Sequence, residues 1–380
     1  MKSKIKRFTP LIMAFIILFT VVGCTNNNSI SSSAEFINFD KAEVLDYSTV
    51  KSLREDFLIK EYQPQIPEKF ELGCIAAYDS KIYYTQFKPI KMAEMNMATN
   101  IVMHDLQTGE NKTIFHIENS GAHYINELYA TGTSLFWVLT INNETRIEKY
   151  DLATQKITHV KIFEDGAVTI LLSSDERYLS WFEANKENKR SLFVYDTIND
   201  QIELISSTIA RQSPYTRAHI NDGIIAFVTS SGEYNTLNVY DLQHKEYRAK
   251  LDFDKETEFA NPIANDKFVI WCAGQLLGSN IDLYAYDLVN KTTIKINDSS
   301  DSDIMVFSFD IIDSTLLIND YKSKQIIGYD IAKKNKSELT SDLSGTHSYL
   351  LAAATADHNF LTYDLNKQQI LLLKKIPDKI

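Results

Sequence analysis

The sequence predicts an all-β fold built from seven repeats of about 45 residues, each with room for four short strands. Three observations support this prediction. A Tyr-Asp motif recurs at a nearly constant interval, a second turn mark recurs at the same interval, and runs of alternating polarity surround both marks. Alternation of apolar and polar residues is typical of strands, and a constant period of this length is typical of repeat architectures.

The first mark ends a short alternating run, as in Ser191–Asp196, and another strand-like run follows it, as in 201–205. An aspartate at this place can accept backbone N–H groups two residues further on and so begin the turn of a hairpin. These acids are therefore predicted to form turns rather than to act in catalysis. The marked residues, which lie 46, 45, 45, 46 and 43 positions apart, are Asp105, Asp151, Asp196, Asp241, Asp287 and Asp330.

The second mark precedes a different strand of each repeat and occurs seven times, once more than the first mark. In the seventh repeat Tyr363-Asp364 follows Asp357 by only seven residues, where the other repeats leave 17 to 26. The last repeat therefore has room for three strands. The second marks are Asp79, Asp175, Asp222, Asp266, Asp313 and Asp357, with Thr131–Ser134 in their place in the second repeat.

The missing strand is predicted to come from the N-terminal side of the repeats. Residues 57–62 alternate like an outer strand and are expected to pair with 368–374, with 36–40 as the alternative donor. An open ring would leave an edge strand exposed, which proteins avoid. Four short strands per repeat match the blade of a β-propeller. We therefore predict an all-β, seven-bladed β-propeller of four-stranded antiparallel blades over 70–376, with an N-terminal segment, 35–69, that includes the closing strand.

The blade sequence resembles the TolB-type propeller repeat, a relative of the tryptophan-aspartate repeat propellers. The resemblance is clearest in the third repeat, where Ser174–Trp181 and Leu192–Asp196 match the turn and two strands of that repeat, and it spans roughly 70–373. It implies binding of protein partners, sugars or peptides outside the cytoplasm. Two departures stand out: the usual Pro-Asp-Gly turn of the family is absent, and TolB has six blades where seven are counted here.

The first 23 residues predict a lipoprotein signal peptide. Four basic residues precede an apolar run, 11–22, which is shorter than the roughly 20 residues that span a membrane. Val21-Val22-Gly23-Cys24 resembles the lipobox, in which Cys24 becomes the lipid-bearing first residue, with palmitate among its acyl chains. An uncleaved anchor and an ordinary secretory signal are the alternatives. Residues 24–34 are predicted to form a flexible tether, which places the protein on the extracytoplasmic face of the cell membrane.

Charge and cysteine content restrict the function further. Removal of residues 1–23, which hold four basic and no acidic residues, changes the formal net charge from −11 to −15. Such an acidic chain disfavours nucleic acid and a polybasic membrane patch. Beyond Cys24 only Cys74 and Cys272 remain, and they fall in blades that are not neighbours. A disulfide needs Cα atoms within about 7 Å, so free thiols are predicted.

Two departures from the repeat are candidate ligand or partner loops. The first, 86–100, contains Met92, Met95 and Met97, which could form an adaptable protein-binding surface or pack on the ring. The second, 206–217, could bind an anionic or sugar ligand or be a solvated loop. Its candidate residues are Arg211, Tyr215 and Arg217, with Gln212 beside them.

Metal and catalytic motifs are weak in this sequence. His116, Glu118 and His123 could bind zinc, but their spacing does not specify a site. Asp298, Asp301 and Asp303 suit calcium in type, but the turn glycine of a calcium loop is absent. No catalytic residue, metal site or cofactor is therefore predicted, and no hydrolase elbow, phosphate loop or dinucleotide fingerprint is present.

Two functions from different classes remain open, beside a third possibility, the sensing of a small ligand in the channel. The leading hypothesis is a non-enzymatic, membrane-anchored scaffold that binds a protein, a sugar or another small molecule. The alternative is a glycan-directed hydrolase or lyase with a site at the channel mouth. An enzyme is expected to gather acids, His or Tyr there from several blades, whereas a scaffold is expected to present an apolar or aromatic patch.

Overall fold

The computed structural model describes residues 34–45, 50–88, 100–117, 123–163, 170–184, 190–209, 217–257, 259–274, 281–297, 304–320, 325–339, 349–364 and 367–376. These residues belong to one compact unit, Ser33–Ile380, and the structure describes none of the other unit, Met1–Ser32. Strands dominate the described part, and none of its helices is long and apolar enough to cross a membrane.

The first eight strands of the repeat region form two antiparallel sheets of four strands each, with the strands in chain order. The innermost strand of each sheet is the first in sequence, and the outermost is the last. One sheet holds β5 (Glu71–Tyr78), β6 (Lys81–Phe87), β7 (Asn100–Asp105) and β8 (Asn111–His116). The other holds β9 (His123–Ala130), β10 (Ser134–Ile141), β11 (Glu144–Asp151) and β12 (Ile157–Phe163).

The next eight strands belong to one nine-stranded sheet, because Ile209 pairs with Thr229 and joins two groups of four. The first group is β13 (Leu172–Ser174), β14 (Tyr178–Ala184), β15 (Arg190–Asp196) and β16 (Gln201–Ile209). The second is β17 (Ile220–Asn221), β18 (Ile224–Ser230), β19 (Tyr234–Asp241) and β20 (Glu246–Asp254), and the ninth strand comes from the N-terminal segment.

The remaining strands form three more sheets, each completed by a strand from the N-terminal segment. The first contains β21 (Phe259–Ala264), β22 (Phe268–Gly274), β23 (Ile281–Asp287) and β24 (Thr292–Lys295). The second contains β25 (Ile304–Ile312), β26 (Thr315–Asp320), β27 (Gln325–Asp330) and β28 (Asn335–Leu339). The third contains β29 (Tyr349–Ala354), β30 (Asn359–Asp364) and β31 (Gln369–Lys375).

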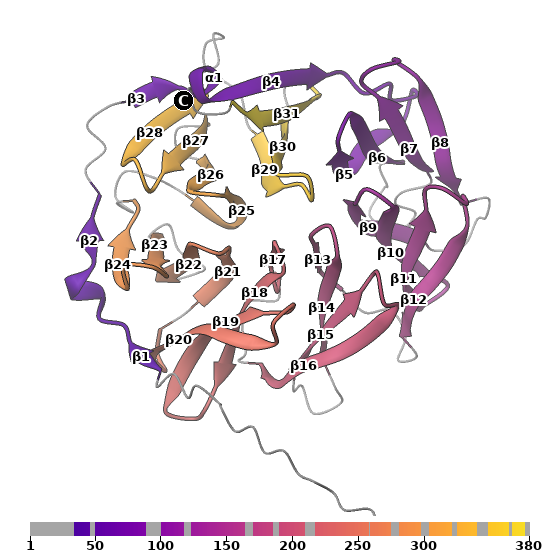
Figure 1. The fold of residues 1–380 in the computed structure, drawn as a ribbon. Helices are drawn as coiled ribbons and strands as arrows, with labels where there is room; N and C mark the ends of the chain where they lie inside the picture. Colours follow the sequence, from indigo (N-terminus) through magenta and orange to yellow (C-terminus); the bar gives the residue numbers. More distant parts are fainter. Residues whose placement is uncertain are drawn as a thin grey trace, which may run out of the picture. The chain divides into compact units, whose positions relative to one another are not determined.

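The N-terminal segment runs along the outer edges of four consecutive strand groups (Figure 1). Three short strands pair in parallel, β1 (Glu35–Phe36) with β20, β2 (Glu43–Val44) with β24, and β3 (Val50–Ser52) with β28. The one-turn helix α1 (Leu53–Asp56) follows, and a short 3-10 turn, Phe39–Lys41, lies between β1 and β2. β4 (Phe57–Tyr62) then pairs antiparallel with β31, from Phe57 opposite Lys375 to Tyr62 opposite Ile370.

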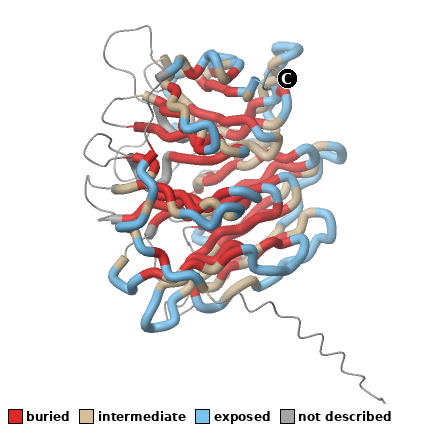
Figure 2. The backbone as a smooth tube through the Cα atoms, turned by 60° about the vertical axis from the view of Figure 1, so that its left-hand side comes forward, coloured by how far each residue is buried: buried red, intermediate tan, exposed pale blue. Residues whose placement is uncertain are grey.

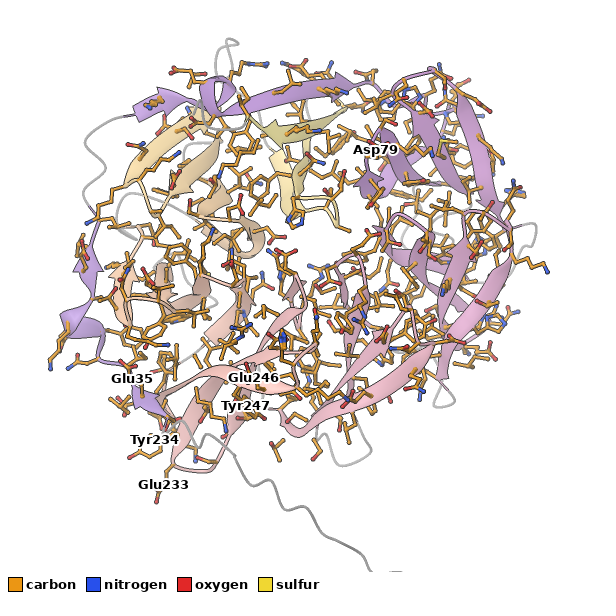
Figure 3. All side chains as sticks on the ribbon, in the orientation of Figure 1. Glu35, Asp79, Glu233, Tyr234, Glu246 and Tyr247 are labelled. Carbon is orange, nitrogen blue, oxygen red and sulfur yellow. The ribbon has the colours of Figure 1, made fainter. Side chains whose placement is uncertain are left out.

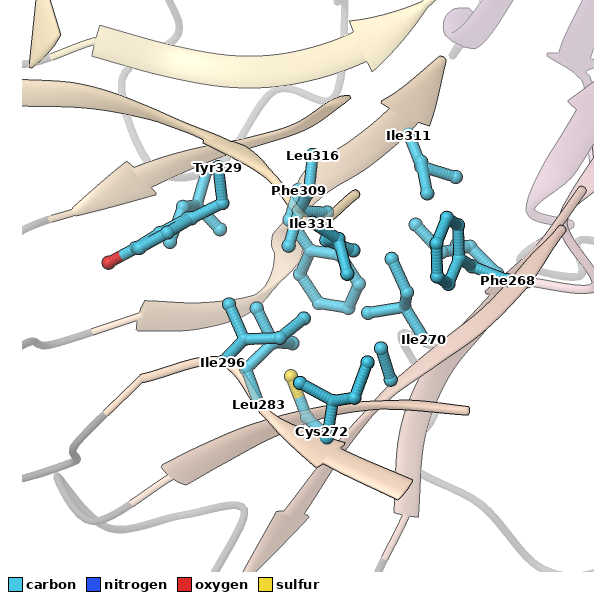
Figure 4. Close-up of a cluster of buried hydrophobic side chains, with 14 of the residues drawn as sticks. Phe268, Ile270, Cys272, Leu283, Ile296, Phe309, Ile311, Leu316, Tyr329 and Ile331 are labelled. Atoms are coloured by element: carbon cyan, nitrogen blue, oxygen red, sulfur yellow. The ribbon is translucent and has the colours of Figure 1, made fainter. Parts of the chain in front are cut away.

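The core lies between neighbouring sheets, because each sheet is apolar on both faces. Buried apolar side chains of the described residues group into seven clusters. The cluster in Figure 4, which includes Phe268, Cys272 and Phe309, lies between the sheets of β21–β24 and β25–β28. Another joins β5–β7 to β30 and β31, so the last repeat packs against the first. Figure 2 shows this burial following the strands, with exposed residues mainly at the turns.

The first turn marks work as predicted. In Asp151, for example, Oδ1 accepts the N–H groups of Ala153 and Thr154. The same two hydrogen bonds, from the N–H groups two and three residues further on, form at Asp105, Asp196, Asp241 and Asp287. The carboxylates of Asp330 and Asp364 each accept the N–H three residues further on. These acids stabilise hairpins, as their period indicated.

The second mark divides into two turn types, which the sequence did not distinguish. At Asp79, Asp222 and Asp313 the backbone has positive φ, between 51° and 53°, which suits a tight hairpin turn. In the second and third repeats, the side-chain oxygen of Thr131 or Asp175 accepts the N–H groups two and three residues further on. In the fifth repeat the accepting residue is Asn265 and not Asp266, and in the seventh Thr355 accepts the N–H of Asn359. The recurring mark thus shows where the turn lies without fixing its acceptor, because amide and hydroxyl oxygens form this turn as well as a carboxylate does.

Candidate ligand site in the central channel

The segment 217–221 places three polar side chains across the space between the innermost strands. It leads into β17, and its residues alternate in direction because it is extended. Ala218 and Ile220 are buried in the cluster between β13–β16 and β17–β20. The other three residues, Arg217, His219 and Asn221, contact strands of more distant repeats. One short alternating run therefore supplies both core and channel side chains.

Arg217 forms an ion pair with Glu127 of β9, two repeats away along the chain. Its Nη2 lies 2.9 Å from Glu127 Oε1. Burial raises the pKa of Glu127, and the guanidinium opposes this effect, while the carboxylate raises the pKa of Arg217. Tyr129 lies on the same strand and donates its hydroxyl to the carbonyl of Leu172 at 2.7 Å. Burial raises the pKa of this phenol, so it is a neutral donor at neutral pH.

His219 contacts Asp310 of β25, in a different repeat from the Glu127 that Arg217 contacts. Its Nε2 lies 3.0 Å from both oxygens of that carboxylate, which also accepts the N–H groups of Ile311 and Ala354. Asn221 donates its amide to the carbonyl of Ile311 at 2.8 Å. These contacts hold the segment across the centre and connect the second, fourth, sixth and seventh repeats.

Two adjoining cavities lie beside this segment, with volumes of about 60 and about 160 Å³. They share lining residues, among them Tyr129, Arg217 and Thr355. The larger cavity has apolar walls from Ala76, Leu128 and neighbouring residues, together with Cys74 and Glu127. The smaller one is more polar and reaches the turns at Asp175 and Asp222. An apolar pocket with a few convergent polar groups is the usual form of a small-molecule site.

The lining holds buried polar atoms that have no hydrogen-bond partner. In the part of the chain that the structure describes, these are Nε of Arg217, Nδ1 of His219, and Oδ1 of Asn126 and of Asn261. A buried polar group without a partner costs about 1–3 kcal/mol. Donor and acceptor atoms left together at one place are therefore suited to a bound polar molecule.

The charge of the lining is acidic. Four carboxylates, those of Glu127, Asp175, Asp222 and Asp310, face one arginine and two histidines, His219 and His358. Burial raises the pKa of Asp175 and of Asp222, the first partly offset by N–H groups that it accepts and the second by His358. Because the arginine is already paired with Glu127, the site has no surplus positive charge for an anion.

Of the predicted loop residues, only Arg217 lies in the described part of the chain. It pairs with Glu127 in the channel, and binding of an anionic or sugar ligand by its loop stays a prediction. Arg211, Gln212, Tyr215, Met92, Met95, Met97 and Cys24 lie outside the described residues, as do Glu118, Asp298, Asp301 and Asp303. His116 contacts Asn100, and no group of residues that could hold a metal ion occurs in the described ranges.

Cys74 and Cys272 are free, as predicted. Cys74 lies in the wall of the larger cavity, and burial raises the pKa of its thiol to about 12, with Glu127 adding to the effect. Cys272 is fully buried in the core, and burial raises its pKa as well. Both thiols are therefore protonated at neutral pH, and neither is a nucleophile in this environment.

Sequence reasoning missed Glu127, Tyr129, His219 and Asp310. They come from three different repeats and form no linear motif. The signal that could have identified His219 is Arg217-Ala218-His219-Ile220-Asn221, an alternating run of polar and apolar residues directly before a second mark. Because Ala218 and Ile220 of this run point into the core, its polar residues point the other way, towards the ring centre.

Comparisons with known proteins support a β-propeller fold. The chain is similar to the β-propeller domain of the Trilobed protease from Pyrococcus furiosus, described as having an open velcro topology, with 14% identity, a TM-score of 0.57, and coverage of 83% of this chain and 97% of that one. It is also similar to oligogalacturonate lyase in complex with manganese, with 12% identity, a TM-score of 0.52, and coverage of 85% and 97%. TolB from Acinetobacter baumannii matches with 13% identity, a TM-score of 0.41, and coverage of 77% and 63%.

Searches with family models and among curated proteins found no match to the sequence. The structural likenesses, all at low identity, therefore establish the fold alone. The chain is an all-β protein with the β-propeller fold, as the repeats predicted. The narrower resemblance to the TolB-type repeat remains a prediction.

Proposed function

We propose that this protein is an extracytoplasmic, lipid-anchored β-propeller that binds a small uncharged or cationic molecule in its central channel. The observation that carries the proposal is the set of unpartnered buried atoms, on Asn126, Arg217, His219 and Asn261, that line two adjoining cavities. The acidic lining disfavours an anion, because the one arginine is already paired with Glu127.

The proposal includes a seven-bladed ring that β4 closes. Three observations support this arrangement. Seven buried clusters lie between consecutive strand groups, β4 pairs with β31, and the N–H of Asp79 donates to Asp357 at 2.7 Å, which joins the turns of the first and last repeats. Asp79 is labelled in Figure 3 at the turn between β5 and β6. The fourth strand of the last blade is then the N-terminal closing strand.

The membrane anchor rests on the sequence alone. Val21-Val22-Gly23-Cys24 supplies the lipobox, and the polar run after Cys24 supplies a tether. In cells that express the full precursor, labelled palmitate should be incorporated into the native chain and not into Cys24→Ser. The native chain should also sediment with membranes. Equal labelling of both proteins would contradict lipidation at Cys24 and leave an uncleaved anchor as the explanation of any membrane association.

Ligand binding can be tested with three matched probes that share a pyranose ring. Glucose is uncharged, glucosamine is cationic and glucuronate is anionic. In saturation-transfer NMR with the mature chain, we expect signals from glucose and glucosamine and a much weaker signal from glucuronate. His219→Ala and Asn261→Ala should abolish these signals, while His244→Ala, whose side chain is 58% exposed on an outer turn, should leave them unchanged. A glucuronate signal as strong as the others, or signals that survive both channel variants, would contradict the proposal.

A glycan-directed hydrolase or lyase is the second candidate, and one observation favours it. Glu127, Tyr129, His219 and Asp310 converge from three repeats, and a His held by a carboxylate can act as a general base. Release of new reducing or unsaturated ends from polysaccharide mixtures would favour the enzyme, provided that Asp310→Asn abolishes the release. Binding without release would favour the ligand-binding protein.

A further inference from the structure

Three short strands of the N-terminal segment show which kind of peptide pairs with the outermost strands of the sheets. We call residues 35–53 the N-terminal belt. Each of its strands, β1, β2 and β3, adds in parallel to the outermost strand of a sheet. Each is followed at once by an apolar residue that enters the core between two sheets. These anchors, Ile37, Leu45 and Leu53, are 4%, 7% and 0% exposed and lie eight residues apart.

The first two belt strands share a residue pattern. Glu35-Phe36-Ile37 and Glu43-Val44-Leu45 each place an acidic residue, an exposed apolar residue and the buried anchor in order. The backbone also continues the ladder past the strand, since Ile37 N–H donates to the carbonyl of Asp252 and Leu45 N–H to that of Lys295. An extended tripeptide of this chemistry is therefore sufficient to pair with an outer edge.

β16 lies on the next edge along the ring from β20, and the belt does not reach it. Among the described residues, only Ile209 of this strand has a strand partner on the outer side. Ile202 and Leu204 project from one face of β16 and are 43% and 52% exposed. Their i, i+2 spacing is that of an apolar stripe along a strand. An unpaired edge with exposed apolar side chains is a template for the addition of another strand.

The surroundings of β16 extend this surface onto β20. Glu203 pairs with Lys245 at 2.9 Å across the two strand groups, so its charge is partly compensated. Tyr247, labelled in Figure 3, is 42% exposed and packs edge-on against Tyr240 at 5.1 Å. β12 is a poorer template, because its exposed Ile157 and Ile162 are five residues apart with a register shift between His159 and Lys161, and so form no i, i+2 stripe.

We propose that the edge of β16 binds an extended segment of a protein partner, which adds in parallel as the belt does on β20, β24 and β28. The segment would place an acidic residue followed by two apolar residues along β16, with its apolar side chains on Ile202 and Leu204. This is strand addition, in which main-chain hydrogen bonds supply affinity and alternate side chains supply specificity. The surface is separate from the channel, so the proposal does not depend on the channel ligand.

The probe for this surface is an acetylated, fluorescent peptide with the sequence of Ala34–Leu45, which carries the belt pattern twice. It is titrated into the mature chain with its own belt intact, and binding is followed by fluorescence anisotropy. We expect the double variant Ile202→Lys/Leu204→Lys to weaken binding by about ten-fold or more. The matched control, Ile157→Lys/Ile162→Lys, changes side chains of similar exposure on β12 and should have little effect.

Hydrogen exchange locates the bound peptide. Slower exchange of amides in 202–208 on peptide addition supports the proposal. Slower exchange at 251–252 or 294–295 instead would mean that the peptide replaces the belt, and this result would overturn it. Absence of binding, or equal binding by the β16 variant, would overturn it as well. Circular dichroism of each variant verifies that the substitutions, all at exposed positions, leave the fold intact.

Discussion

At the residue scale, aspartates at one repeated position stabilise turns through backbone N–H groups, and Asp241 also has charged partners. It accepts the N–H groups of Gln243 and His244 and pairs with Arg248 at 2.6 Å. Burial of its carboxyl raises the pKa, but the contacts of His244 and Arg248 outweigh burial and hold the pKa at about 2. The unfolded chain has a higher value, near 3.8, so folding favours the ionised form.

The sign of the pH dependence follows from this depressed pKa. Asp241 stabilises the fold fully above about pH 4, and its contribution disappears as the pH falls towards 2. Asp241→Asn should therefore lower the free energy of unfolding by about 1–2 kcal/mol at pH 7 and have a smaller effect near pH 2. Urea denaturation at a series of pH values measures both. Asp254→Asn, at an exposed strand end, is the control, and equal effects of the two variants at all pH values would contradict the assignment.

The Arg217–Glu127 pair gives a second test at this scale. Arg217→Met leaves a buried carboxylate without its partner, which should cost about 3–5 kcal/mol of unfolding free energy at pH 7. Because burial raises the pKa of Glu127, the folded variant binds a proton more readily than the unfolded chain, so its stability should fall as the pH rises from 5 to 8. The double variant Glu127→Gln/Arg217→Met should recover most of the loss. Chemical denaturation of the native chain, the two single variants and the double variant across this pH range measures the coupling. If the losses of the two single variants add up in the double variant, the residues are not a coupled pair.

At the element scale, the repeats were predictable and the belt was not. Alternating strands and their aspartate turns depend on residues close in sequence, so the turn positions from Asp105 to Asp330 follow from the sequence alone. The belt strands are two or three residues long, too short to show alternation, and each pairs with a strand more than 200 residues away. The sequence feature that marks the belt is the eight-residue spacing of Ile37, Leu45 and Leu53. This spacing indicates edge strands only when the outer strands that the belt contacts are known.

The channel site was only partly predictable for a related reason. Arg217 was a candidate because its loop departs from the repeat, yet its partner Glu127 lies in an ordinary strand of another repeat. Local sequence determines which way each strand residue points, and ring geometry determines which residues then meet. His219 and Asp310 meet across the ring centre in the same way, so no spacing in the sequence encodes their contact.

The belt anchors have a measurable share in stability. Leu53 is fully buried among Phe57, Leu317, Ile326 and Phe360, and a Cβ at Gly328 would lie 2.8 Å from its Cδ1, so a glycine there leaves room for it. Leu53→Ala should cost about 2–5 kcal/mol of unfolding free energy, the range for a large-to-small core change. Val44→Ala, at a 71% exposed position on the same belt, should change it by less than about 0.5 kcal/mol. Similar effects of the two in urea denaturation would mean that the anchors do not hold the belt.

At the scale of the whole molecule, the proposed closure joins residues near the two ends of the described chain. A repeat protein is stabilised chiefly by contacts between neighbouring repeats, so a ring gains one more interface than an open array of the same repeats. Here that interface includes Tyr62, which stacks on His104 with ring centroids 3.8 Å apart, as well as the cluster of Ala77, Ile82 and Leu361. Loss of the closing strand should therefore weaken the first and last blades together.

Deletion of residues 35–62 tests this dependence on the N-terminal segment. If the segment closes the ring, the deletion should remove the single cooperative unfolding transition, because it takes away the fourth strand of the last blade and three edge strands. Calorimetry and circular dichroism measure the transition. A melting temperature equal to that of the mature chain would rule out closure by this segment.

A disulfide between β4 and β31 tests whether the two strands stay paired in the native protein. Leu58 and Lys374 are opposite each other in the β4 and β31 ladder, and both are exposed, so Leu58→Cys/Lys374→Cys should be tolerated by the reduced protein. The disulfide would close a loop that spans most of the chain, and a loop of that length is expected to add about 3–5 kcal/mol to the free energy of unfolding. Oxidised and reduced samples are compared by thermal denaturation, and the native thiols, Cys74 and Cys272, have raised pKa values that keep them protonated at neutral pH. If the strands separate freely in the native ring, the disulfide should form slowly and leave the melting temperature unchanged. If β4 is a permanent part of the last blade, it should form quickly and raise that temperature, since it constrains only the unfolded chain.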